Sequence, residues 1–222
     1  MLIRILSFAL VILFFSNCKS INQRKDSATA QINNLKSGVL LVRLPSNAGK
    51  IEKLKSMGQG KLAKKEKVLM KQFHTQVLRS FDQSFDFCPV YFYHSENSKQ
   101  VKSRKFEGNI FDDNKNEIGD LEFAPENIFY AEFGQVHSEE MTVNKNGETT
   151  KVAGFGGKDA LVIRNQDGLQ PPRPFPYAMD YKSIINDNNL GKSVEKLNKR
   201  LHDAYDKMQR RYLRRKARGK VD

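Results

Sequence analysis

The sequence predicts an α/β fold: a mixed β-sheet with a helical β-α-β crossover, antiparallel strands and a C-terminal amphipathic helix. Three observations predict it. Two apolar stretches, residues 38–45 and 88–95, flank a long segment of helical composition. Asn-Gly and Asp-Gly dipeptides punctuate later strand-like stretches, which is typical of antiparallel strands. The chain ends in a segment whose apolar residues recur every three or four positions.

The β-α-β unit is predicted from the first half of the chain. GVLLVRLP (Gly38–Pro45) is a continuous apolar run bounded by Gly and Pro, which suits a strand buried on both faces. From Ala48 to Phe85 the spacing predicts two helices, with Gly58 ending the shorter first one. CPVYFYHS (Cys88–Ser95) is the second strand, and the helical crossover makes the two strands parallel.

Further strands are predicted in the second half. Short strand-like pieces are expected between Val101 and Phe111, and NIFYAEFGQV (Asn127–Val136) alternates as a long strand. The Asn-Gly dipeptide within residues 144–151 predicts a hairpin. ALVIRNQDGLQ (Ala160–Gln170) predicts a strand, an Asp-Gly turn and a return.

The last predicted element is an amphipathic helix over Ser193–Lys216, with Ser193 as its N-cap. The resulting element order is similar to that of thioredoxin-like domains, which place a β-α-β unit before a hairpin and a terminal helix. The chain has no Cys-x-x-Cys, so this resemblance implies a layout and no redox chemistry.

The N-terminal residues predict where in the cell the protein is located. After Arg4, an apolar run from Ile5 to Phe15 is interrupted only by Ser7 and stops just before Cys18. As a helix it spans about 16 Å, roughly half of a bilayer core, which is typical of a secretion signal and too short for a membrane span. The stretch resembles the signal peptide of bacterial lipoproteins. An ordinary secreted protein, cut near Ser16, is the alternative.

The lipoprotein resemblance implies that Cys18 becomes the first mature residue and carries lipid, palmitate included, as a membrane anchor. Asn17 stands where such signals usually have Gly, Ala or Ser. The residue after the cysteine is Lys19 and not Asp, and in this the chain resembles lipoproteins that are sorted to the outer membrane. The predicted organisation is a signal peptide (1–17), a flexible polar tether (18–36), an α/β globular domain (37–191) and a basic amphipathic helix packed on that domain (192–222).

The net charge of +13 is unevenly distributed. Residues 19–80 carry +11, residues 81–150 carry −8 and residues 192–222 carry +8. This asymmetry predicts either internal complementarity or a surface for anionic partners. The predicted contact surface is the basic C-terminal end, for which a solvated helix end is the alternative: Arg210, Arg211, Arg214, Arg215, Lys216 and Arg218.

Candidate metal and catalytic residues are few. His94 and His137 each follow a predicted strand, with Glu139 nearby, so neighbouring strands would bring a His/His/Glu metal set together; exposed histidines are the alternative. Neither Gly-x-Ser-x-Gly nor His-Glu-x-x-His occurs. Cys88 lies among aromatic residues, which is typical of a buried thiol and not of a nucleophile.

Two glycine- or proline-rich stretches remain. GFGGK (Gly154–Lys158) lacks the Walker spacing, which favours a flexible connection over a phosphate loop. Leu169–Tyr181 has four prolines within six residues. It is either a proline-rich ligand for an aromatic groove or a strap that packs Phe175 and Tyr177 onto the domain, with a cis bond before Pro176.

The sequence therefore predicts a lipid-anchored protein of the cell envelope with a non-catalytic binding or assembly role and no cofactor. Its expected partners are the membrane, through lipidated Cys18, and an anionic lipid, a polysaccharide or an acidic envelope protein. Export disfavours nucleic acid, although a cytoplasmic nucleic-acid binder with a misleading leader is a further interpretation. The main alternative is an envelope enzyme with a metal-dependent site near His94 and His137.

Overall fold

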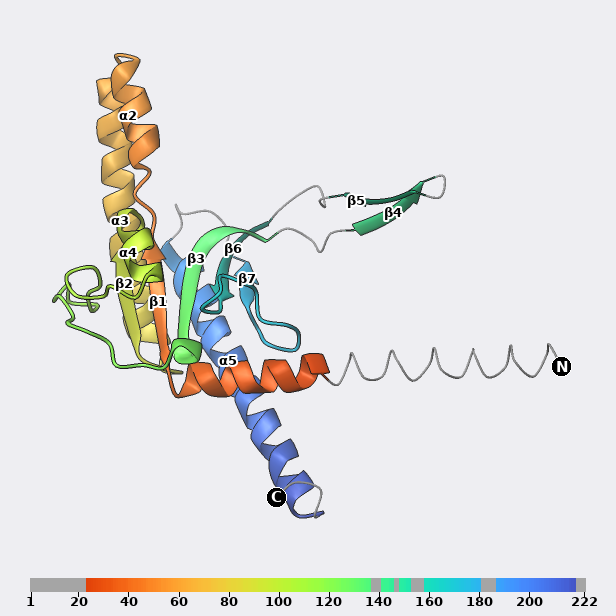
Figure 1. The fold of residues 1–222 in the computed structure, drawn as a ribbon. Coiled ribbons are helices and arrows are strands. Elements are labelled where there is room, and N and C mark those ends of the chain that lie inside the picture. The colour runs from red at the N-terminus through yellow and green to blue at the C-terminus, as the bar shows by residue number, and fades with distance from the viewer. Residues whose placement is uncertain (1–22, 137–140, 146–147, 153–157, 181–186, 219–222) are drawn as a thin grey trace.

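The protein is built around one mixed sheet, as the sequence predicted (Figure 1). The computed structural model describes residues 23–136, 141–145, 148–152, 158–180 and 187–218. The strand order is β2-β1-β3-β6-β7, with β1 parallel to both β2 and β3, and the remaining two pairs antiparallel. The strands are β1 (Val39–Leu44), β2 (Val90–His94), β3 (Ile128–Val136), β6 (Lys158–Arg164) and β7 (Ala178–Asp180).

The central strand β1 is buried on both faces, which confirms the prediction from its continuous apolar run. Leu40 and Val42 pack into the larger core cluster, on the side of the sheet that the long helices cover. Val39 and Leu41 point the other way, into a second cluster with Tyr93 and other aromatic residues. Because other elements cover both faces of this strand, neither face is exposed to water, and its residues do not alternate between apolar and polar.

The crossover from β1 to β2 contains the two predicted helices, α2 (Ala48–Ser56) and α3 (Gly60–Ser84). Gly58 lies between them with a φ of 74°, a left-handed conformation that glycine adopts without a steric cost. The second half of α3 buries Phe73, Val77 and Phe81 against the sheet. The first half projects beyond the sheet with α2, which buries no residue (Figure 1).

The segment between β2 and β3 differs from the prediction. In place of strand-like pieces, it forms η1 (Ser95–Asn97), α4 (Ser98–Lys102), a long loop and η2 (Pro125–Asn127). The loop contributes single bridges only, from Phe111 to Phe92 and to Glu117. Its apolar residues, among them Phe106, are spaced to cover the second face of the sheet and not to alternate along a strand.

Residues 23–36 also differ from the prediction, because they form a helix where a flexible tether was expected. Ala28, Ile32 and Leu35 are each at most 1% exposed and belong to the larger core cluster. Their spacing forms one narrow apolar stripe on an otherwise polar helix. Composition alone does not reveal such a stripe, but its packing against the core stabilises the helix. After this helix, a side chain at Gly38 would collide with the Asn127 carbonyl oxygen.

The second half of the chain supplies a hairpin and the last helix. β4 (Met141–Lys145) and β5 (Glu148–Val152) pair antiparallel, which confirms the predicted hairpin, although its Asn-Gly turn and Gly154–Gly157 lie outside the described residues. Helix α5 (Asp187–Lys216) begins before the predicted Ser193 cap; the Ser193 hydroxyl instead donates to the Asn189 carbonyl within the helix, at 2.8 Å. Its apolar face shares the larger core cluster.

Candidate functional site

A groove forms where three segments distant in sequence meet: the helix over residues 23–36, the proline-rich strap (residues 169–180) and the second half of α5. In Figure 1 the first helix crosses α5 at the end of the sheet opposite to the projecting α2–α3 hairpin. The Gln209 side-chain amide donates to the Asn33 side-chain oxygen at 3.4 Å, which links these two helices. The groove has a volume of about 960 Å³.

The floor of the groove is apolar and well packed. Phe175 from the strap is 3% exposed and stacks on Phe129 of β3, with ring centroids 6.1 Å apart and planes 9° apart. Ile32 lies in the same core cluster, and Met208 packs against that cluster from α5. The predicted strap is therefore confirmed for Phe175, while the cis peptide bond lies before Pro174 and not before Pro176.

The rim of the groove is basic. Asp203 is the one acidic residue of the lining. Six basic residues line the groove, and we call them the basic rim: Arg24, Lys25, Arg173, Arg200, Lys207 and Arg211. Among the described residues, none of these side chains forms an ion pair. Arg200 has only a contact of 3.2 Å to the Met179 sulfur.

This arrangement favours a ligand with two kinds of surface. A guanidinium group binds a phosphate or carboxylate through paired N–H donors, and an unpaired guanidinium keeps those donors available. An apolar floor favours hydrocarbon. Together, the basic rim and the floor fit an amphiphile with an anionic headgroup.

The predicted basic end of α5 overlaps this groove only in part. Arg211 belongs to the basic rim, whereas Arg210, Arg214 and Arg218 are exposed beside it or beyond it. Arg215 and Lys216 lie in α5, but their side chains are outside the described part of the structure. The sequence analysis missed the other five rim residues, because its tether prediction removed Arg24 and Lys25 from the folded body and no pattern linked the strap to α5.

The strands next to the two predicted metal histidines are not adjacent in the sheet. Strand β1 lies between β2, which ends at His94, and β3, which ends just before His137. His137 and Glu139 lie outside the described residues. The rings beside His94 are those of Phe111 and His74, with centroids 5.1 and 5.5 Å away. Within the described ranges, no three His, Cys, Asp or Glu side chains gather closely enough to hold a metal ion.

Of the two cysteines, the structure describes only Cys88. Cys88 is buried in the larger core cluster, and this burial raises the pKa of its thiol to about 12, so the thiolate that a nucleophile needs is absent at neutral pH. This confirms the buried thiol that the sequence predicted. Cys18 lies outside the described residues, and its lipidation stays a prediction.

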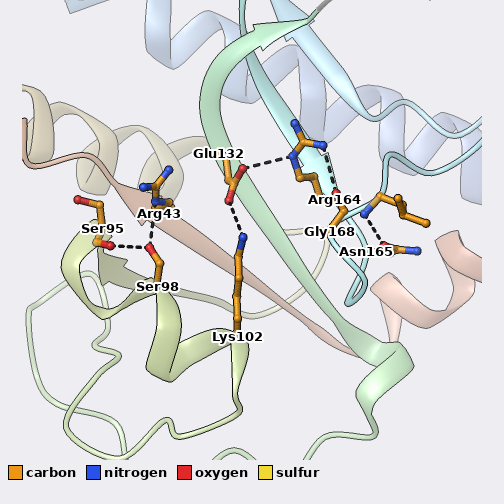
Figure 2. Close-up of polar contacts among 9 residues, drawn as sticks. Arg43, Ser95, Ser98, Lys102, Glu132, Arg164, Asn165 and Gly168 are labelled. Atoms are coloured by element: carbon orange, nitrogen blue, oxygen red, sulfur yellow. Dashed lines mark hydrogen bonds and ion pairs between the residues drawn. The ribbon is translucent and has the colours of Figure 1, made fainter.

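A second set of basic side chains lies on the face of the sheet opposite to the one that α3 and α5 cover (Figure 2). Glu132 of β3 accepts from Arg164 Nε at 3.2 Å and lies 3.7 Å from Lys102 Nζ. Arg43 Nε donates to the Ser98 hydroxyl at 3.1 Å, and the Arg164 guanidinium also donates to the Gly168 carbonyl at 3.2 Å. We call Glu132, Lys102 and Arg164 the Glu132 cluster.

The Glu132 cluster joins structural elements. Its side chains come from α4, β3 and β6, and the Arg164 contact to Gly168 holds the turn after β6, where Asn165 Oδ1 accepts from the Leu169 amide at 2.9 Å. The adjoining cavity is only about 130 Å³. Because the carboxylate already pairs with both cations, we assign this cluster to the fold and not to a ligand.

None of the helices in the described part of the chain combines the length and hydropathy that a membrane span requires. Comparisons with protein families, with curated proteins and with solved structures found no match to this chain. The resemblance to thioredoxin-like domains therefore stays a prediction about element order, and the groove has to be interpreted from its own chemistry.

Proposed function

We propose that this chain is a lipid-anchored protein of the cell envelope, in the outer membrane, with a non-catalytic binding role. Its groove binds the anionic headgroup of a membrane lipid. The observation that carries the proposal is the basic rim around a floor of Ile32 and Phe175. A phosphate group on a hydrocarbon chain matches both surfaces.

The helix over residues 23–36 supports a position close to the membrane. A flexible tether over the whole of 18–36 would reach up to about 65 Å, whereas the five residues from Cys18 to residue 23 reach at most about 18 Å. Arg24 and Lys25 lie at the start of this helix and line the groove. A lipid on Cys18 would therefore hold the groove within a short distance of the bilayer surface.

Among the expected partners, an anionic lipid fits the groove best. A polysaccharide offers anionic groups but no hydrocarbon for the apolar floor. An acidic protein segment would place its charges on the basic rim, but its binding would not depend on a membrane surface. A lipid would also reach the site by lateral diffusion within one membrane, since the proposed anchor lies in the same bilayer.

Vesicle binding tests the groove. The chain from residue 19 onward keeps every element described above and lacks the lipid. We expect it to bind vesicles that contain phosphatidylglycerol and to bind phosphatidylcholine vesicles far more weakly. Replacing Arg173, Arg200 and Arg211 together with alanine should lower the affinity about a hundredfold, at about 1 kcal/mol for each basic residue near an anionic surface.

A matched control removes the same charge elsewhere. Lys61, Lys64 and Lys65 are exposed on α3 and line no part of the groove. Their joint replacement with alanine should lower the affinity less than tenfold. Equal losses in the two triple variants would mean that net charge, and not the groove, attracts the vesicle. Binding to acidic peptides or polysaccharide in preference to vesicles would assign the groove to those partners instead.

Intact mass of the protein from membranes tests the anchor. We expect a mature chain that starts at Cys18 and carries acyl groups, and we expect this species to disappear in Cys18→Ser. An unmodified full-length chain in both samples would contradict anchoring without deciding what the groove binds.

A further inference from the structure

A second cleft lies at the carboxyl ends of the parallel strands β1 and β2, and it shares no lining residue with the basic groove. Leu44 ends β1 and pairs in register with His94, which ends β2. In open α/β sheets this edge is where ligands usually bind, because loops and helix ends diverge there and leave a crevice. The cleft has a volume of about 320 Å³, near the lower end for small-molecule sites.

The lining combines apolar contacts with basic and polar side chains. Leu44 and Leu78 are buried, and the half-buried Phe111 ring lies 5.1 Å from that of His94. Lys71 approaches from α3 and Lys115 from the loop after α4. The remaining polar side chains are His74, Thr75, Asn97, Asn109 and a single carboxylate, Glu117.

The two histidines form the centre of the cleft. His74 Nε2 lies 2.6 Å from the Pro45 carbonyl oxygen, so this nitrogen carries the proton and donates it. Its ring lies 5.5 Å from that of His94. Partial burial, together with the neighbouring His74, lowers the pKa of His94, which is therefore neutral at pH 7. An anion in the cleft would offset both effects.

The loop that carries Lys115 is built to hold its position. The Asp112 carboxylate accepts from the backbone and side-chain nitrogens of Asn116, at 2.7 and 2.8 Å. Lys115 itself has a φ of 67°, in the left-handed region that lysine seldom adopts. Among the described residues, neither Lys71 nor Lys115 forms an ion pair. A strained, unpaired lysine beside a cleft is a feature typical of ligand sites.

We propose that this cleft binds a small organic anion. Lys71 and Lys115 pair with its carboxylate or phosphate group, and Phe111 and Leu44 contact its apolar part. The site is independent of the basic groove, so this proposal goes beyond membrane binding and stands or falls without it.

Calorimetric titration of the full-length protein in detergent tests the proposal. The probes are benzoate and phenyl phosphate, with benzyl alcohol as the uncharged control. We expect saturable binding of at least one anion, and the tighter of the two identifies the anionic group. Benzyl alcohol should bind at least tenfold more weakly. The double variant Lys71→Ala/Lys115→Ala should raise the dissociation constant of the preferred anion at least tenfold.

The matched control is Lys67→Ala/Lys105→Ala, which removes two exposed lysines that line no part of the cleft. It should leave the dissociation constant within about twofold. Absence of saturable binding by both anions would overturn the proposal. So would equal affinities in the two double variants, or benzyl alcohol binding as tightly as the anions.

A pH series adds a readout specific to the histidines. The groups around His94 are Lys71 and His74 on α3, Glu96 on η1, and Lys115 and Glu117 on the loop. A bound anion raises the pKa of His94 back towards its ordinary value, so binding takes up a proton. Benzoate affinity should therefore rise severalfold from about pH 8 to about pH 6, and His94→Gln should weaken this dependence. A pH-independent affinity would contradict the role of His94.

Discussion

The basic groove and the Glu132 cluster both gather arginine and lysine side chains, but they use them differently. In the Glu132 cluster two cations converge on one half-buried carboxylate that joins β3, β6 and α4. In the groove six cations surround an apolar floor with a single acidic residue, and none forms an ion pair among the described residues. The same side chains stabilise the fold where a carboxylate lies between them, and are available to a ligand where none does.

Phe175→Ala should have the largest effect, because it removes the aromatic part of the floor and leaves Ile32 and the basic rim in place. Phe175 is buried and stacked on Phe129, so its truncation should lower the free energy of unfolding by about 3 kcal/mol, measured by urea denaturation. Leu169→Ala, at a side chain that is 63% exposed in the same strap, should cost less than about 0.5 kcal/mol. Equal effects would show that the strap does not pack as described.

Glu132→Gln should lower the free energy of unfolding by about 1–2 kcal/mol, because it leaves Arg164 and Lys102 close together without a counter-charge. Lys102→Ala should cost only about 0.5 kcal/mol, since that side chain is about half exposed. Urea denaturation measures both. A neutral Glu132→Gln variant would remove the distinction between the two regions.

Asp203→Asn should strengthen binding, because Asp203 is the one carboxylate in the groove lining. Removing one negative charge near an anionic surface is worth about 1 kcal/mol, or about a fivefold gain in affinity for phosphatidylglycerol vesicles. Asp206→Asn, an exposed α5 residue outside the lining, is the control and should gain less. A weaker Asp203→Asn variant would place the lipid elsewhere.

Arg173→Ala should change stability least. Arg173 is exposed and makes no ion pair with the described residues, so its removal should alter the free energy of unfolding by less than about 0.5 kcal/mol while lowering vesicle affinity about fivefold. Thermal unfolding and vesicle flotation measure the two effects. A large loss of stability would mean that the groove, like the Glu132 cluster, serves the fold.

Much of the architecture follows from local patterns. The apolar run of β1, the helix spacing before and after Gly58 and the β4–β5 hairpin each follow from patterns over a few residues, and these predictions are confirmed. The helix over residues 23–36 was missed, since only Ala28, Ile32 and Leu35 mark its apolar stripe. The segment after β2 was mistaken for strands because its aromatic residues have a high strand propensity, whereas their burial under the sheet decides their structure.

The sequence by itself determined the α/β class, the parallel crossover and the basic C-terminal helix, because hydrophobic periodicity and turn chemistry are local properties. Only the tertiary structure decided which cations belong together. Arg24, Arg173 and Arg211 are far apart in the chain and meet in the groove. On the opposite face of the sheet, Arg164 and Lys102 both pair with Glu132. Charge pairing depends on distance in space, which no spacing along the chain records.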